Sequence, residues 1–342
     1  MKRILINGFG RIGRCVFRNL WERGNNSQCV AVNDPAMSID NMVYLLKFDT
    51  IYGSFDGNVY KDDDDTVCVF DDQKKWRFKV YGQRDFFEDG DKFDFDVVIE
   101  SSGRDSCAVS SRKCLEYGAK YCIITNTFFD SDFTYVMGYN GKSWKVNKDK
   151  IISTSICDAN ATIPLLGKIN DCIGIDYCFL TTLHPWLSYQ NIMDAPVRMQ
   201  KREGEMSDYF PLGRASVDTL IPKTTTVGPV IQRIIPELKN KISSFSYRTP
   251  TQIVASADMS VVLSKESSKG EIIELLNQIE SQVVSLNTED IISIDCRKSS
   301  FSSIVDTRWV TVEGNKLKLI TWYDNEWGYC SRVIDLISKM DF

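Results

Sequence analysis

The stretch ILINGFGRIG, residues 4–13, decides the fold of the N-terminal part of this chain, because a GxGxxG pattern directly follows a short apolar run. In a dinucleotide-binding turn, the first glycine (Gly8) permits a tight bend and the second (Gly10) lets the backbone approach a pyrophosphate. The third (Gly13) allows a helix to pack closely on the strand. The start of that helix offers free N–H groups and a positive dipole end, so the pattern predicts a phosphate site.

A second apolar run, residues 29–32, ends beside Asp34, about 20 residues beyond the last glycine. A carboxylate at this distance accepts hydrogen bonds from the ribose hydroxyls of NAD and repels the 2′-phosphate of NADP. The sequence therefore predicts NAD as the cofactor. The alternative is an ordinary glycine turn with a surface aspartate.

The order of the patterns predicts two domains. Apolar runs alternate with helical patterns up to about residue 156, which is typical of a parallel sheet. Beyond it, long alternating runs predict a mostly antiparallel sheet with helices on one face. The expected fold is α/β, with a Rossmann-type NAD-binding domain over 1–156, a C-terminal helix over about 323–342, and an α+β catalytic domain over 157–322.

The expected elements follow from the same patterns. In the first domain they are strands at 3–7, 28–33, 96–101 and 121–125, helices near 11–22, 39–48 and 106–117, and an inserted hairpin at 66–70 and 76–81. In the second they are strands at 173–183, 244–248, 253–263, 308–313 and 316–322, helices near 157–170, 227–238 and 268–285, and a final helix at 327–340. The irregular stretch 185–222 is long for a compact domain and predicts a functional loop.

The composition is that of an ordinary globular protein, with 342 residues, 43% hydrophobic and 25% charged. A net charge of −5 gives no general attraction to nucleic acid or anionic membranes, and no apolar run is long enough to span a bilayer. Eleven cysteines without a secretory leader predict reduced thiols and a cytoplasmic location. No CxxC pair is present, and the acidic run 62–65 is typical of a solvated turn, so no metal is expected.

Cys157 follows the apolar run 151–156 and begins a helical pattern. A helix N-terminus lowers the pKa of a thiol, so Cys157 is a candidate nucleophile. The chain's one histidine, His184, ends a second apolar run and is either a structural residue or the partner base. Together with a dinucleotide site, the pair predicts a thiolate that adds to an aldehyde, a histidine that takes the hydroxyl proton, and a hydride that leaves for the nicotinamide. A thioester then remains for transfer to an acceptor.

Over nearly its whole length the chain resembles the phosphorylating glyceraldehyde-3-phosphate dehydrogenase family. The resemblance rests on INGFGRIGR (6–14), NDPAMSIDNMVYLLKFDTIYGSF (33–55), ESSGR (100–104) and WYDNEWGY (322–329). It implies that D-glyceraldehyde 3-phosphate, phosphate and NAD are converted to 1,3-bisphosphoglycerate and NADH by a homotetramer, with Cys157 and His184 as catalytic residues. The cofactor-binding positions that it implies are Gly8, Gly10, Arg11, Ile12, Gly13, Asp34, Ser102, Gly103, Thr125, Asn325 and Tyr329.

The departures from the family lie in the anion pockets. STSICDAN (153–160) stands where the family has SNASCTTN, so Ile156 and Asp158 replace a serine and a threonine of the phosphate pocket. HPWLSYQ (184–190) replaces HSYTATQ, and the stretch from His184 to Pro222 is nine residues longer than usual. The pocket positions that the resemblance assigns are Ile156, Asp158, Leu187 (for threonine), Arg214, Thr225, Thr226 (for glycine) and Arg248.

Asp158 weighs most among these departures. A carboxylate a few ångströms from a docked phosphate costs several kcal/mol at an effective dielectric near 20, more than a neutral hydrogen bond returns. Phosphorylation should therefore be weak, and the acyl group would pass to water or an amine, or the aldehyde would differ. Asp158 would also oppose a low thiol pKa. Two alternatives stay open: Asp158 faces away or caps the helix while the usual reaction survives, or the protein binds NAD without catalysis.

Overall fold

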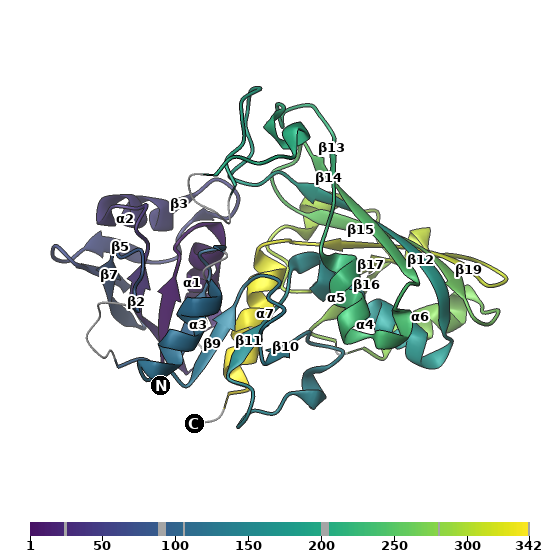
Figure 1. Cartoon of the computed structure of the whole chain (residues 1–342), viewed down its shortest axis with the longest axis horizontal. Coiled ribbons are helices and arrows are strands. Elements are labelled where there is room, and N and C mark those ends of the chain that lie inside the picture. Colours follow the sequence, from purple (N-terminus) through teal and green to yellow (C-terminus); the bar gives the residue numbers. More distant parts are fainter. Residues whose placement is uncertain (24–25, 88–93, 105–106, 200–204, 280, 341–342) are drawn as a thin grey trace. The chain divides into compact units, whose positions relative to one another are not determined.

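A computed structural model describes residues 1–23, 26–87, 94–104, 107–199, 205–279 and 281–340 (Figure 1). The chain divides into two compact units. Unit 1 comprises Met1–Thr134, Trp144–Thr154 and Cys330–Phe342, and unit 2 comprises Tyr135–Ser143 and Ser155–Tyr329. The division differs from the expected one in three places, because residues 135–143, 155–156 and 323–329 group with unit 2.

The sheet of unit 1 is parallel except at its inserted hairpin. Its strands, in spatial order, are β10 (Phe133–Thr134), β11 (Ile151–Ser153), β9 (Tyr121–Ile124), β8 (Val97–Glu100), β1 (Lys2–Asn7), β2 (Ser27–Asn33), β7 (Lys75–Tyr81), β6 (Thr66–Phe70) and β5 (Asn58–Lys61). Helices α1 (Arg11–Arg23), α2 (Ile39–Lys47) and α3 (Cys107–Glu116) and the ribbon β3 (Phe48–Asp49) and β4 (Gly53–Ser54) complete it, and α7 (Trp327–Ser338) joins it from Cys330. Strand β1 lies between β2 and β8 in this order. In open α/β sheets, the carboxyl ends of the strands at such a reversal of strand order are where dinucleotides bind.

Helix α1 is packed on several sides, because all its residues from Gly13 to Trp21 are buried. Phe17 sits at the centre of an aromatic cluster, with ring contacts to Phe9, Phe55 and Trp76. Each such buried ring stabilises the unit by roughly 1.5–3 kcal/mol. The packing holds the start of α1 directly after the glycine turn, as the phosphate prediction requires.

Unit 2 is built on a mixed sheet. In spatial order its strands are β13 (Ile221–Lys223), β14 (Ile242–Thr249), β12 (Ile175–Pro185), β15 (Ala255–Leu263), β19 (Lys316–Tyr323), β17 (Ser303–Asp306) and β16 (Val284–Asn287), with β18 (Thr311–Glu313) also paired to β19. The pairs β12–β14 and β16–β17 are parallel and the others are antiparallel.

Helices cover one face of this sheet (Figure 1). They are α4 (Cys157–Cys172), α5 (Val227–Ile234) and α6 (Lys269–Asn277). Unit 2 also contains 3₁₀ turns at Gly141–Ser143, Phe210–Gly213, Pro236–Leu238, Ser293–Cys296 and Thr307–Trp309. Along β12, buried residues alternate with exposed ones such as Phe179 and Leu183. The covered face therefore carries Thr182 and His184, whereas the opposite face keeps large apolar side chains exposed.

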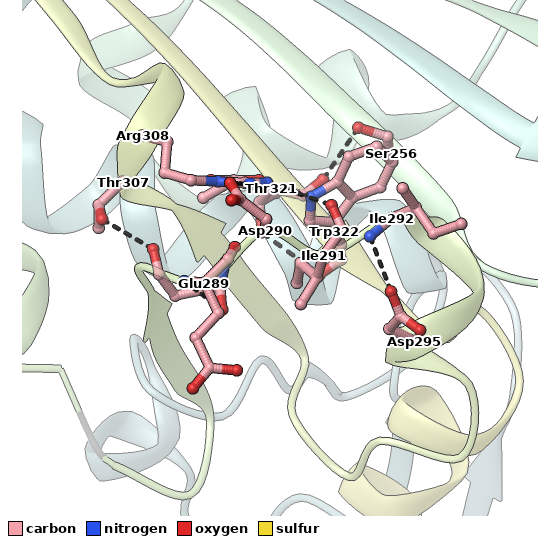
Figure 2. Close-up of polar contacts among 12 residues, drawn as sticks. Ser256, Glu289, Asp290, Ile291, Ile292, Asp295, Thr307, Arg308, Thr321 and Trp322 are labelled. Atoms are coloured by element: carbon pink, nitrogen blue, oxygen red, sulfur yellow. Dashed lines mark hydrogen bonds and ion pairs between the residues drawn. The ribbon is translucent and has the colours of Figure 1, made fainter.

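A polar network ties the loops beside β17 to β19 (Figure 2). Arg308 donates two hydrogen bonds to the buried carboxylate of Asp306 and a third to Asp290, and the indole Nε1 of Trp322 also donates to Asp306. The Arg308 hydrogen bonds hold the pKa of Asp306 below its ordinary value. The hydroxyl of Ser256 donates to the backbone oxygen of Thr321, which joins β15 to β19 through side chains as well.

Two expectations for the C-terminal part were wrong. The helix expected over 268–285 ends at Asn277, and strand β16 begins at Val284. The strand expected over 308–313 begins as a 3₁₀ turn, Thr307–Trp309, and continues as β18. The acidic run 62–65 lies in an exposed turn between β5 and β6, as expected. Within the described ranges, no helix combines the length and the apolarity needed to cross a membrane.

Candidate active site and cofactor site

The glycine turn of unit 1 has the form that a dinucleotide needs. Gly8 has φ +93°, and a Cβ there would lie 2.5 Å from the backbone nitrogen of Ser102. A Cβ on Gly13 would lie 2.1 Å from the carbonyl oxygen of Gly8. A Cβ on Gly10, by contrast, would meet nothing within 4 Å. The outer glycines are thus required by the fold, and the middle one leaves open the space that a pyrophosphate would fill.

Asp34 is fixed at the end of β2 beside this turn. Its carboxylate accepts hydrogen bonds from the backbone N–H of Phe9 at 2.8 Å and of Ala36 at 2.9 Å. These bonds orient the carboxylate, and each oxygen keeps a second lone pair for a ribose hydroxyl. The arrangement fits the predicted role of Asp34 as the carboxylate that binds the ribose hydroxyls.

The other cofactor positions of unit 1 gather around Glu100, at the end of β8. Ser102 donates its hydroxyl to the Glu100 carboxylate, and Thr125 donates its hydroxyl to the Glu100 backbone oxygen at 3.1 Å. Gly103 takes φ +70°, which favours glycine. The Arg11 guanidinium pairs with Asp49. Arg11 would therefore contact a phosphate through its backbone N–H at the start of α1, and not through its side chain.

Cys157 is the first residue of α4, and the chain bends sharply before it. Ser155 has φ +58°, and its carbonyl oxygen accepts a hydrogen bond from the Tyr329 hydroxyl at 3.1 Å. Ile156 occupies the N-cap position and gives the helix no side-chain cap. The bend leaves Cys157 half-buried at the start of a long helix.

His184 faces this sulfur from β12. The distance from Sγ of Cys157 to Nε2 of His184 is 3.5 Å. Nδ1 lies 2.7 Å from the carbonyl oxygen of Pro185, which can only accept, so Nδ1 carries the proton. Nε2 therefore presents its lone pair to the thiol, which is the tautomer that a general base needs.

Asp158 is buried and turned toward the same sulfur. Its Oδ1 lies 3.4 Å from Sγ of Cys157 and accepts a hydrogen bond from the Tyr323 hydroxyl at 2.8 Å. Its Oδ2 accepts from the Thr225 hydroxyl at 3.4 Å. The side chain thus neither faces away nor caps α4, and the carboxylate belongs to the thiol site.

Arg248 brings a buried cation to the site. It is the register partner of His184 in the parallel pair β12–β14, so both side chains lie on the covered face. Its Nε is buried and has no hydrogen-bond partner among the described residues. A buried donor of this kind suits an anionic group. Lys223, on β13, adds positive charge near His184.

The pKa directions correct one expectation. Burial, together with the Asp158 carboxylate, raises the pKa of Cys157 well above its ordinary value. Burial, together with Arg248, lowers the pKa of His184 to about 4. The expected lowering of the thiol pKa by the helix end was wrong, because burial and a neighbouring carboxylate outweigh it. The resting pair is therefore a thiol and a neutral imidazole rather than a thiolate and an imidazolium.

The remaining predicted pocket residues are dispersed. Thr226 takes the N-cap position of α5 without capping it through its side chain. The backbone N–H of Leu187 donates to the side chain of Gln190. Arg214 is mostly exposed and pairs with Asp194 at 2.9 Å, so it does not join the polar contacts around Cys157.

Two of the predicted cofactor positions belong to unit 2. The Asn325 side-chain oxygen accepts a hydrogen bond from the backbone N–H of Val254 at 3.1 Å. Val254 is held at φ +67°, a rare conformation for a β-branched residue. This bond orients the amide of Asn325, whose NH₂ group can donate to a carboxamide oxygen. Tyr329 is buried and bonds to Ser155, as described above.

Sequence reasoning missed Lys223 and Tyr323. The signal for Lys223 was its place two residues before Thr225, at the end of a short apolar run. Tyr323 stands inside the WYDNEWGY motif, but its role depends on Asp158, which is far away in sequence.

The structure combines a glycine-rich turn suited to a dinucleotide, an aspartate placed to bind ribose, and a thiol that faces an imidazole. These features define an NAD-dependent oxidoreductase. Comparison with known proteins agrees. Residues 2–106 match the NAD-binding domain of glyceraldehyde 3-phosphate dehydrogenase, and residues 156–325 match its C-terminal domain. The chain belongs to the glyceraldehyde-3-phosphate dehydrogenase family.

Similar proteins match almost end to end. Glyceraldehyde-3-phosphate dehydrogenases 4 and 1 of Caenorhabditis elegans are each 34% identical over 340 residues, which is 97% of this chain and 96% of theirs. Glyceraldehyde-3-phosphate dehydrogenase B of Aspergillus oryzae is 33% identical over 344 residues, 98% of this chain and 96% of its own. The predicted family, fold class and cofactor are thereby confirmed.

Proposed function

We propose that this protein oxidises a small aldehyde with NAD through a thioester on Cys157. The observation that carries the proposal is the 3.5 Å approach of Sγ to Nε2 of His184, with the imidazole proton fixed on Nδ1. As Sγ adds to the aldehyde carbon, Nε2 takes the thiol proton and delivers it to the carbonyl oxygen. Nε2 then removes the hydroxyl proton of the thiohemiacetal. NAD, when bound, supplies the acceptor for the hydride.

An anionic group on the aldehyde fits the charges of unit 2. The buried Nε of Arg248 lacks a hydrogen-bond partner among the described residues, and Lys223 adds positive charge. A phosphate or carboxylate on the substrate would satisfy the Arg248 donor, and the charge of Lys223 would attract it. Glyceraldehyde 3-phosphate, after which the similar proteins are named, is the first substrate to test.

A neutral acyl acceptor is favoured over inorganic phosphate. Asp158 is buried 3.4 Å from Sγ, so an incoming phosphate would meet a second anion there. Water or an amine carries no such charge and can give a proton to the Asp158 carboxylate as it attacks the thioester carbon. With water, the thioester yields a carboxylic acid and the free thiol.

The experiment follows NADH formation with glyceraldehyde 3-phosphate, in the presence and absence of phosphate or arsenate. Steady turnover without either anion, together with a thioacyl adduct on Cys157 by mass spectrometry, supports the proposal. Strong dependence on phosphate would exclude the neutral acceptor. NAD binding without a burst of NADH would exclude catalysis on the tested substrate.

Two variants test the mechanism in the same assay. Cys157→Ser should abolish oxidation and leave NAD affinity nearly unchanged, because the hydroxyl is a far weaker nucleophile. His184→Asn should slow hydride transfer by roughly 10²–10⁴, the contribution of a general base. Substantial activity in Cys157→Ser would rule out the covalent route.

We also propose that the chain assembles into a homo-oligomer, a tetramer by its family. Phe179, Leu183 and Phe245 are exposed on strands β12 and β14, on the face of the sheet opposite the helices. Such apolar surface is typical of an interface. Light scattering coupled to gel filtration tests this, and a monomer at micromolar concentration would refute it.

The described cysteines are all free thiols, which supports a reducing compartment such as the cytoplasm.

A further inference from the structure

Three different metal-ligating side chains converge at the start of α4. The Cys157 sulfur, a carboxylate oxygen of Asp158 and a ring nitrogen of His184 all lie within 4.8 Å of one another. Sγ is 3.4 Å from Oδ1 of Asp158 and 3.5 Å from Nε2 of His184. Around a tetrahedral zinc ion with bonds of about 2.0–2.3 Å, neighbouring ligand atoms are about 3.3–3.6 Å apart. The distances from Sγ to Oδ1 and from Sγ to Nε2 thus already match such a site.

The groups behind these ligands are those that orient metal ligands in proteins. The imidazole of His184 is anchored through Nδ1 to the Pro185 carbonyl, which directs Nε2 toward the sulfur. The Asp158 carboxylate is held by the Tyr323 hydroxyl. Both ligand side chains are buried, so little reorganisation is needed on binding.

The charges also suit a divalent ion of intermediate softness. A thiolate and a carboxylate together neutralise Zn²⁺, and sulfur with imidazole selects zinc over magnesium or calcium. Arg248 and, more weakly, Lys223 oppose binding electrostatically, whereas the thiolate and the carboxylate would contact the ion directly. Binding replaces the thiol proton, so Cys–SH and Zn²⁺ give Cys–S–Zn⁺ and one H⁺.

We propose that Cys157, Asp158 and His184 form a zinc site with three protein ligands and an open fourth position. The ion would occupy both the nucleophile and the base, so it would act as a reversible inhibitor. That consequence rests on the proposed function, whereas the binding itself does not. Because Asp158 stands where the family has threonine, Asp158→Thr is a matched variant that keeps the cysteine–histidine pair and removes the third ligand.

The experiment measures binding directly, on the full-length protein freed of metal. Zn²⁺ is titrated against a competing chelator, and Co²⁺ is used as an optical probe for tetrahedral thiolate coordination. The wild type should bind one ion per chain, release about one proton and protect Cys157 from alkylation, followed at that peptide by mass spectrometry. Cys172→Ser, at an exposed cysteine on the far end of α4, should bind as the wild type does.

The variants separate a ligand from a supporting residue. Tyr323→Phe should lower the affinity for Zn²⁺ by about 10–100-fold, which is the usual effect of losing a hydrogen bond to a metal ligand. Asp158→Thr should lower the affinity for Zn²⁺ by more than about 100-fold, because it removes a ligand. Equal affinity in Asp158→Thr and the wild type, or a cobalt spectrum without a thiolate band, would overturn the proposal. NAD binding by each variant shows that it is folded, and NADH formation by the metal-free wild type tests the proposed function separately.

Discussion

Replacing Asp158 by threonine should make the protein much more responsive to inorganic phosphate. The carboxylate accepts a hydrogen bond from Thr225, which the sequence resemblance assigns to an anion pocket, and it lies beside the sulfur that we propose carries the acyl group. Threonine removes the charge and restores a hydroxyl donor. Arg248 is present in both proteins, so its attraction cancels in the comparison.

The size of the effect follows from the geometry. The Thr225 hydroxyl is 3.4 Å from Oδ2 of Asp158, and a phosphate oxygen bonded to that hydroxyl would lie about 2.8 Å from it. The two anions would therefore be at most about 6 Å apart. At an effective dielectric near 20, two unit charges at about 6 Å repel by about 3 kcal/mol. Since about 1.4 kcal/mol is tenfold, the KM for phosphate should fall by about 100-fold.

The assay is the initial rate of NADH formation over a range of phosphate concentrations, with arsenate as a second acceptor. Asp158→Asn is the control, because it removes the charge but keeps the shape, and it should recover most of the gain. If the wild type saturates at low millimolar phosphate, or if neither variant changes the KM for phosphate, the repulsion argument is refuted.

Four further predictions test other parts of the structure. Gly13→Ala should destabilise unit 1, because its Cβ would clash with a backbone oxygen, whereas Gly10→Ala should keep the melting temperature and weaken NAD binding measured by calorimetry. Because the folded pKa of His184 is about 4, below the unfolded 6.5, stability should fall as pH drops from about 6.5 to 4; His184→Gln should remove about 2 kcal/mol of that loss at pH 5 in urea titrations. Arg248→Met should raise the pKa of His184 and shift the acid limb of kcat/KM to higher pH; an unmoved limb would show that burial alone sets it. Arg308→Met should lower the urea midpoint at pH 7, and its gap from the wild type should narrow as acid protonates the Asp306 carboxylate; a constant gap would mean that the ion pair contributes nothing.

The cofactor half of the protein was readable from its sequence because its signals are local. The glycines that must bend the chain lie within a few residues of one another, and β1 supplies a continuous apolar run before them. Asp34 follows at the end of the next strand, where two backbone N–H groups fix it. Each of these constraints acts over a short stretch, so the pattern and the structure agree.

The thiol site was only partly predictable because its contacts are long-range. Helical position alone suggested a lowered pKa for Cys157, but burial and the orientation of Asp158 reverse the direction. That orientation depends on Tyr323, far along the chain. Strand β17 was missed for a related reason: its four residues are all buried and lack the alternation that marks a half-exposed strand.

The register between β12 and β14 fixes the positions of His184 and Arg248 relative to each other. Slipping one strand by a residue would turn one of these side chains to the opposite face of the sheet and leave the other behind. The residues proposed to accept the proton and to bind the anion can therefore be repositioned only together. Because the paired backbones prevent either residue from shifting alone, an adaptation to a longer or shorter substrate must come from the loops that follow these strands.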